Sequence, residues 1–185
     1  MAKVILDITM SLDGFIAASN GDPAPRLHQW FFAPSGTSTE VIDEQLNTIG
    51  AIIMGRRTYD IGDKVDGFID NPFDVPHFVL THHTPAELAK GATAFTFVTD
   101  GIDSALKQAS SAAGDKYVCV LGGADIAQQY LKAGLLDELQ IQIVPTLLGE
   151  GTRLFEHIGQ ESIELESTRV IDSGNVTHLR FRIIK

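Results

Sequence analysis

Two segments of this sequence carry residues suited to binding phosphate. In each, a short apolar run leads into glycine and then into a predicted helix start: 51–54 continues as Gly55-Arg56-Arg57-Thr58, and 117–121 continues as Gly122-Gly123-Ala124. A strand that ends at a helix N-terminus leaves free backbone N–H groups and the positive end of the helix dipole at the sheet edge. Glycine lets a ligand approach the backbone closely. Two such segments, one with paired arginines, predict a site for a diphosphate cofactor that carries a further phosphate.

Each segment also has a plainer interpretation. Arg56 and Arg57 could be two solvated side chains on a short surface helix, and Gly122-Gly123 could be an ordinary turn between a strand and a helix. A charge-assisted hydrogen bond from arginine to phosphate is worth about 1.5–3 kcal/mol, and the hydroxyl of Thr58 could add a further bond. The second segment lacks the G-x-G-x-x-G spacing, so a Rossmann dinucleotide site is not indicated.

The histidines and the single cysteine do not indicate a metal site. His82 and His83 follow a predicted apolar strand and could contact a phosphate, but adjacent strand residues point to opposite faces. The histidines at 28, 77, 157 and 178 show no ligand spacing. Cys119 lies inside an apolar strand, where a small buried hydrophobe is expected rather than a reactive thiol. We therefore expect no bound metal.

Three further residues are candidates for the substrate side of a site. Asp13, in the segment 11–14, could bind or protonate a substrate, although an Asp-Gly pair is also typical of a turn. Trp30 and Phe31 could line a pocket for a flat ring, or they could belong to the core.

The elements that must position these residues follow from the apolar pattern. Strands are predicted at 3–10, 51–54, 77–81, 93–98 and 117–121, with an irregular segment at 11–29 that could form a short extended piece at 15–17. Helices are predicted from Ser38, from Asp100 as a capping residue to Gly114, and from Ala124 to Gly134. The stretches 138–144, 163–170 and 176–184 alternate, and a hairpin turn is predicted at 172–175. The pattern predicts one α/β domain over 1–185 with three layers and a mixed central sheet, antiparallel at its C-terminal end.

Composition narrows the possible partners. The formal net charge is −10 and the 14 Lys and Arg residues are dispersed, so nucleic acid is not an expected partner. No apolar run is long enough to span a membrane, and the N-terminus has no signal-peptide organisation. We expect a cytoplasmic protein with a small-molecule substrate.

Together these segments resemble the dihydrofolate-reductase-like superfamily, and within it the branch of the reductase domain of bacterial riboflavin biosynthesis. The likeness covers nearly the whole chain. It rests on five motifs in order, at 11–16, 54–59, 121–124, 134–139 and 144–151, and ends at Leu154-Phe155. No single motif decides it, but five in the right order are specific.

The resemblance implies a reduced nicotinamide cofactor that lies across the strand ends, usually NADPH, with NADH as the alternative. By position, Gly55, Arg56, Arg57 and Thr58 would hold phosphates, Thr81 and His82 would flank the 2′-phosphate, Gly122, Gly123, Ala124 and Asp125 would receive the diphosphate, and Thr9, Ile16 and Ala17 would lie near the nicotinamide. The resemblance also implies a cis Gly122–Gly123 peptide, common in this family, and a homodimer.

Two functions are consistent with this sequence. The first is an NAD(P)H-dependent reductase that transfers a hydride to a small heterocyclic or sugar-like molecule, with Asp13 or a water supplying a proton. The second is a catalytically weak nucleotide-binding dimer that acts as a sensor or regulatory partner.

Overall fold

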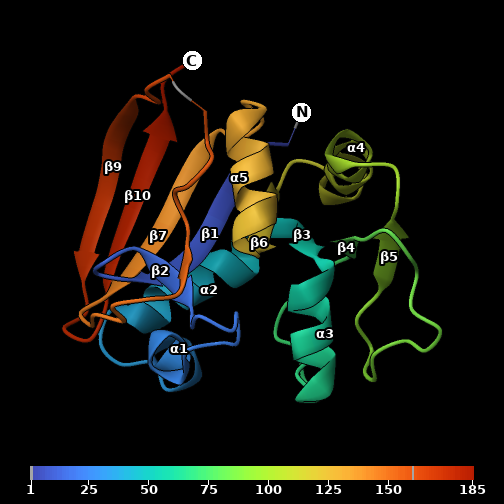
Figure 1. Cartoon of the computed structure of the whole chain (residues 1–185), viewed down its shortest axis with the longest axis horizontal. Coiled ribbons are helices and arrows are strands. Elements are labelled where there is room, and N and C mark those ends of the chain that lie inside the picture. The colour runs from blue at the N-terminus through green and yellow to red at the C-terminus, as the bar shows by residue number, and fades with distance from the viewer. Residues whose placement is uncertain (1, 160) are drawn as a thin grey trace.

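The computed structural model describes residues 2–159 and 161–185. Its centre is an eight-stranded sheet in the order β5-β4-β3-β6-β1-β7-β10-β9 (Figure 1). The strands of this sheet are β1 (Val4–Ser11), β3 (Ile49–Gly55), β4 (His77–Leu80), β5 (Phe95–Val98), β6 (Tyr117–Gly122), β7 (Glu138–Val144), β9 (Leu165–Asp172) and β10 (Thr177–Ile183). Two short strands, β2 (Phe15–Ala17) and β8 (Thr152–Arg153), form a second sheet. The helices are α1 (Pro25–Phe32), α2 (Ser38–Thr48), α3 (Arg56–Lys64), α4 (Ile102–Ala113) and α5 (Ala124–Lys132).

The sheet is mixed, as predicted. Strands β5, β4, β3, β6, β1 and β7 run parallel to one another, whereas β10 runs antiparallel to both β7 and β9. The sequence placed 138–144 in the antiparallel half, and this was only half right: β7 is parallel to β1 on one side and antiparallel to β10 on the other. The predicted α/β architecture with an antiparallel C-terminal end is confirmed.

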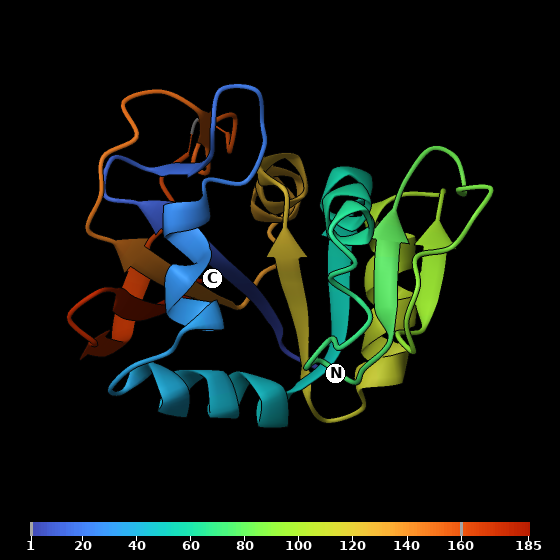
Figure 2. The same ribbon diagram turned by 90° about the horizontal axis from the view of Figure 1, so that it is seen from below.

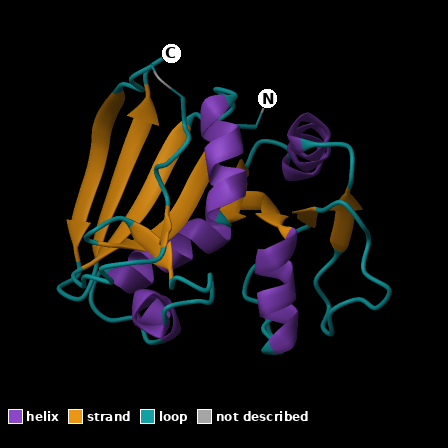
Figure 3. Ribbon diagram, viewed as in Figure 1, coloured by secondary structure: helices purple, strands orange, loops and turns teal. Residues whose placement is uncertain are grey.

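Helices cover both faces of the sheet and produce three layers (Figure 3). Successive strand residues point to opposite faces, so Ile53 packs with Tyr130 and the alanines of α4, while Ile52 packs with Tyr59 of α3 and Leu46 of α2. Every residue of β3 is buried. Burying an isoleucine side chain contributes about 1.5–3 kcal/mol, so these continuous apolar runs fix the parallel strands between the two helical layers.

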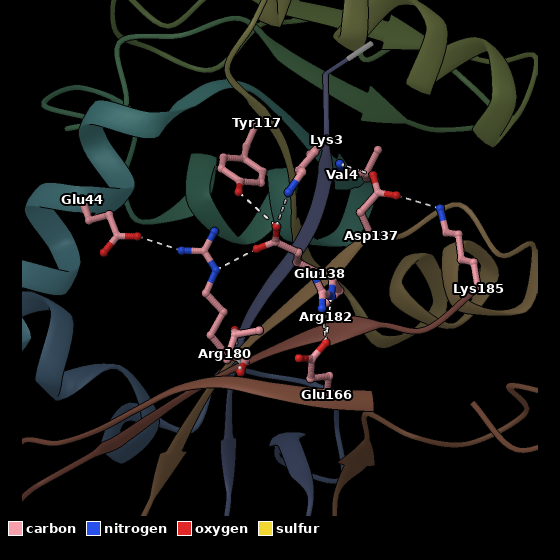
Figure 4. A network of polar contacts seen from close by, with 11 residues as sticks. Lys3, Val4, Glu44, Tyr117, Asp137, Glu138, Glu166, Arg180, Arg182 and Lys185 are labelled. Atoms are coloured by element: carbon pink, nitrogen blue, oxygen red, sulfur yellow. Dashed lines mark hydrogen bonds and ion pairs between the residues drawn. The ribbon is translucent and has the colours of Figure 1, made fainter. Parts of the chain in front are cut away.

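The end of the sheet where the parallel strands begin is closed by a polar network (Figure 4). The carboxylate of Glu138 accepts hydrogen bonds from Lys3 Nζ at 3.1 Å, from the Tyr117 hydroxyl at 3.1 Å and from Arg180 Nε at 2.8 Å. Arg180 also donates to Glu44 of α2 at 2.7 Å. This network joins β1, β6, β7, β10 and α2, and it lies opposite the strand ends that carry the predicted site.

Three local predictions were wrong. The segment 11–29, predicted to be irregular apart from a short extended piece at 15–17, also contains most of α1, whose Leu27 and Trp30 are buried, whereas the extended piece is confirmed as β2. Asp100 does not cap α4, because Gly101 occupies the N-cap position and no side chain caps the helix. Among the described residues no peptide bond is cis, so the Gly122–Gly123 bond is trans, with φ of Gly123 at 84°.

Candidate functional site

A groove of about 880 Å³ runs along the edge where the parallel strands end. It is lined by Ile8 and Thr9 of β1, by the last residues of β3, β4, β5 and β6, and by the first residues of α3 and α5. Figure 2 shows β6 leading into α5 and β3 leading into α3 at this edge. Because neighbouring strands lie about 4.8 Å apart, the path from β5 to β1 is roughly 19 Å long. The groove therefore suits an extended ligand rather than a compact one.

Every residue predicted to bind the cofactor lines this single groove. They are Thr9, Ile16, Ala17, Gly55, Arg56, Arg57, Thr58, Thr81, His82, Gly122, Gly123, Ala124 and Asp125. The loops after β3 and after β6 meet at its centre, as the fold topology requires of neighbouring parallel strands.

At the centre of the groove two helices begin side by side. Neither α3 nor α5 has a side-chain cap, so the first backbone N–H groups of both helices remain available. The glycines allow this close approach: a Cβ on Gly55 would lie 2.9 Å from Ile126 Cγ1, and one on Gly122 would lie 3.0 Å from Thr58 Oγ1. Two uncapped N-termini make a cradle for an anion, and a diphosphate fits that donor set.

The two arginines stand at opposite rims of this cradle. Arg56 donates from Nε to Asp60 at 2.6 Å and from Nη1 to the carbonyl of His83 at 2.9 Å, which ties α3 to the loop after β4. Arg57 donates from Nη2 to the carbonyl of Asn20 at 2.5 Å and thereby ties α3 to the β2–α1 loop. Each guanidinium links a helix start to a loop that borders the groove.

The β4 end of the groove is polar. Strand β4 ends at Leu80, so Thr81, His82 and His83 belong to the following loop, with both histidines exposed. The Thr81 hydroxyl donates to the carbonyl of His83 at 2.8 Å and accepts from the His83 N–H at 3.2 Å. This turn presents the loop beside the guanidinium of Arg56.

At the β1 end, the structure adds a residue that sequence reasoning did not select. His28 of α1 lines the groove together with Thr9, Ile16 and Ala17. Burial lowers the pKa of its imidazole below the usual value. Helical spacing could have indicated this position. Leu27 and Trp30, three residues apart, form the buried side of α1, and His28 lies next to that side. Because the segment 11–29 was predicted to be irregular, this spacing could not be read as helical.

The predicted substrate residues Trp30 and Phe31 do not line the groove. Trp30 is 4% exposed, and its Nε1–H donates to Thr9 Oγ1 at 3.1 Å from behind the groove wall. Phe31 stacks on Phe73 with ring centroids 6.2 Å apart. The core interpretation of these aromatic rings is the one the structure supports, because α1 turns them toward the sheet.

The predicted proton donor Asp13 also lies outside the groove. Its carboxylate accepts from Ser11 Oγ at 2.6 Å, from Gly149 N at 2.8 Å and from Leu148 N at 3.1 Å. The Ser11 hydrogen bond, with those backbone bonds, lowers the pKa of Asp13 to about 2. An ionised carboxylate has no proton to give, so Asp13 joins two loops rather than facing a substrate.

Residues 2–159 and 161–185 contain neither a candidate membrane-spanning helix nor a candidate metal site. No helix in these ranges has the length and apolar character needed to cross a membrane. Within the same ranges, no three His, Cys, Asp or Glu side chains are grouped so as to hold a metal ion.

The sequence matches the family model described as the RibD C-terminal domain over residues 2–179. The uncharacterized protein YyaP of Bacillus subtilis is 29% identical to it, with 94% of this chain and 92% of YyaP covered. The riboflavin biosynthesis protein RibD of Corynebacterium ammoniagenes is also 29% identical, but the match covers 83% of this chain and only 46% of that protein.

Solved structures share the fold. RibD of Acinetobacter baumannii superposes with a TM-score of 0.71 at 20% identity, covering 100% of this chain and 58% of that one. Dihydrofolate reductase from Enterococcus faecalis, solved in complex with NADP(H), gives 0.63 at 15% identity, covering 99% of this chain and 97% of that one. The predicted likeness to dihydrofolate-reductase-like folds is confirmed by these neighbours.

Proposed function

Since this chain belongs to the RibD C-terminal domain family, we propose that it is a reductase that binds a reduced nicotinamide dinucleotide, NADPH in preference to NADH, in the groove at the strand ends. When bound, this cofactor supplies a hydride. The acceptor is a small heterocyclic or sugar-like molecule that lies beside the nicotinamide. The observation that carries the proposal is the pair of uncapped helix N-termini, α3 and α5, at the centre of an elongated groove.

The geometry supports one orientation of the cofactor. The diphosphate lies in the central cradle, where backbone N–H groups and the positive dipole ends of two helices converge. The adenosine lies toward β4 and β5, where Arg56 stands beside Thr81 and His82. The nicotinamide lies toward β1, near Thr9, Ile16 and Ala17. The protein then acts by holding donor and acceptor close together and by keeping water away from them.

Truncating Arg56 tests the cofactor preference. A guanidinium that contacts the 2′-phosphate of NADPH has no such partner in NADH, so Arg56→Ala should weaken NADPH binding roughly tenfold or more and leave NADH binding nearly unchanged. Lys64→Ala removes the same charge from the exposed far end of the same helix and serves as the control. Dissociation constants from isothermal titration for both nucleotides decide the matter, and an equal loss for both would contradict this role of Arg56.

Turnover separates the reductase from the alternative of a nucleotide-binding sensor. The reductase consumes NADPH in the presence of one of a panel of pterins, flavin precursors and quinones, followed by the loss of reduced-nicotinamide absorbance. Tight NADPH binding with no consumption across the panel would favour the sensor. The family membership also leads us to propose a homodimer, which light scattering of the purified protein measures.

A further inference from the structure

The β1 end of the groove has an unusual set of polar groups. Strand β1 contributes Ile8 and Thr9, and the neighbouring β2, β2–α1 loop and α1 contribute Ile16, Ala17, Pro23 and His28. No carboxylate of the described residues lines this end, since the one acid along the groove, Asp125, starts α5. Arg57 reaches this end from α3, but its guanidinium is bonded to the carbonyl of Asn20 and lies 3.8 Å from the carboxylate of Asp22.

The hydroxyl of Thr9 is oriented by Trp30, which does not itself line the groove. It accepts a hydrogen bond from Trp30 Nε1 at 3.1 Å, and no acceptor among the described residues takes its own proton. A threonine hydroxyl has one donor and two acceptor positions, so with one lone pair used by the indole the O–H remains to donate. Trp30 is 4% exposed and rigidly packed, which makes it a positioning residue for this donor.

The imidazole of His28 is the second donor. It makes no hydrogen bond to any described residue, and burial lowers its pKa, which keeps the ring neutral at pH 7. A neutral imidazole carries one N–H donor. The β1 end therefore offers hydrogen-bond donors from Thr9 and His28, with the hydroxyl of Thr152 of β8 beside Ala17, and no carboxylate of the described residues.

We propose that this end of the groove receives an uncharged ring compound whose reducible C=O or C=N group accepts hydrogen bonds from the Thr9 hydroxyl and the His28 imidazole. This inference rests on the proposed function, because it places the acceptor beside the nicotinamide. Where both donors reach the same heteroatom, they polarise its double bond and hold it near the bound cofactor. The cation that reaches this end, Arg57, lies 3.8 Å from the carboxylate of Asp22, which offsets part of the positive charge that a phosphorylated substrate would need.

The proposal is tested by ligand binding to the protein loaded with NADP⁺, so that no turnover occurs. The probes are two neutral compounds, menadione and 6,7-dimethylpterin, and one charged compound, a phosphorylated ribosylaminouracil. Thr9→Val and His28→Asn should each weaken the better neutral probe about three- to tenfold, the usual effect of losing one neutral hydrogen bond. The controls are Thr96→Val, at the exposed position of β5, and His157→Asn, both outside the groove and expected to change nothing.

A spectroscopic readout keeps the test independent of affinity. In protein labelled with ¹⁵N-histidine, the His28 ring resonances should shift when the neutral probe is added to the NADP⁺ complex, and those of His157 should not. Trp30→Phe should weaken the probe in the wild-type background but add nothing in the Thr9→Val background, because Trp30 acts through Thr9.

The outcomes separate cleanly. Tighter binding of the phosphorylated probe, unchanged binding in both variants, or no neutral probe bound by a protein that does bind NADP⁺ would each overturn the inference while leaving the cofactor site standing. Failure of the wild-type protein to bind NADP⁺ would contradict the proposed function itself, and the inference with it.

Discussion

At the scale of single residues, the most consequential side chain outside the groove is Asp7 of β1. It points into the layer between the sheet and α2, where it accepts from Gln45 Nε2 at 2.5 Å and from Gln142 Nε2 at 2.9 Å. Burial raises its pKa to about 6, against the opposing effect of these two hydrogen bonds. The alternating pattern of β7 predicted that its glutamines would be exposed. Gln140 and Gln142 are instead buried under α2, so the sequence did not indicate this polar layer.

Asp7 should make the stability of the protein depend on pH between about 4 and 6. A carboxyl group whose pKa is raised in the folded state binds a proton more tightly there, so the free energy of unfolding falls as pH rises from the unfolded pKa to the folded one. The shift corresponds to about 3 kcal/mol at most. Asp7→Asn removes this titration. The free energy of unfolding measured with urea should therefore fall less between pH 4 and pH 7 in the variant than in the wild type.

The matched control is Asp115→Asn, at an exposed position. It should retain the pH dependence of the wild type. An Asp7→Asn variant whose stability changes with pH as the wild type does would show that Asp7 does not titrate in this range.

Residue types alone could not assign Asp13, Trp30 and His28. An acid, an indole and an imidazole within the same twenty residues are all chemically competent, and their roles depend on which way the backbone turns. Asp13 is turned toward the N–H groups of Leu148 and Gly149, far away in sequence, and Trp30 is turned toward β1 by α1. Helix α1 has only eight residues, so its apolar residues are too few to predict which way each side chain points.

At the scale of elements, the two strand-to-helix turns were predictable because buried strand, glycine and helix start follow one another without interruption. Their convergence follows from the pairing of β3 with β6 in parallel, since parallel strands end at the same edge. The detailed shape of the cradle was not predictable, because it depends on contacts between the turns, such as the approach of Thr58 to Gly122.

Gly123 gives a test of the second turn with a close match elsewhere in the chain. Gly123 has φ of 84° and Gly174, in the β9–β10 hairpin, has φ of 79°, and neither backbone leaves a Cβ in steric conflict. Gly123→Ala and Gly174→Ala should therefore both lose about 1–2 kcal/mol of stability. Only Gly123→Ala should weaken NADPH, because it disturbs the first N–H groups of α5. Equal NADPH affinity in the two variants would contradict the cradle.

The polar network at the opposite end of the sheet has a different expected effect. Glu138 and Arg180 have side chains that are only 12% and 16% exposed, so Glu138→Gln should cost about 3 kcal/mol, typical of breaking a buried pair. Glu166→Gln, which breaks the exposed pair with Arg182, should cost less than about 1 kcal/mol. Chemical denaturation measures both. Because the network is remote from the groove, NADPH affinity should be unchanged in each folded variant.

At the scale of the whole molecule, the mixed sheet and its antiparallel C-terminal end followed from a change in sequence pattern. Continuous apolar runs gave way after residue 137 to alternation, and that change marks the transition to β7, β10 and β9. The double role of β7 could not be predicted, because its pairing with β1 joins residues more than 130 positions apart. The groove extends from β5 to β1 because β1 pairs with β6 on the side opposite β7.

We propose that one extended dinucleotide lies along the strand ends with its diphosphate between α3 and α5. A crystal structure of the protein with NADP⁺ tests this most directly. We expect the diphosphate at the N–H groups of both helix starts, the adenosine near Thr81 and the nicotinamide near Thr9. A nucleotide bound elsewhere, or bound in the reverse direction along the groove, would contradict it.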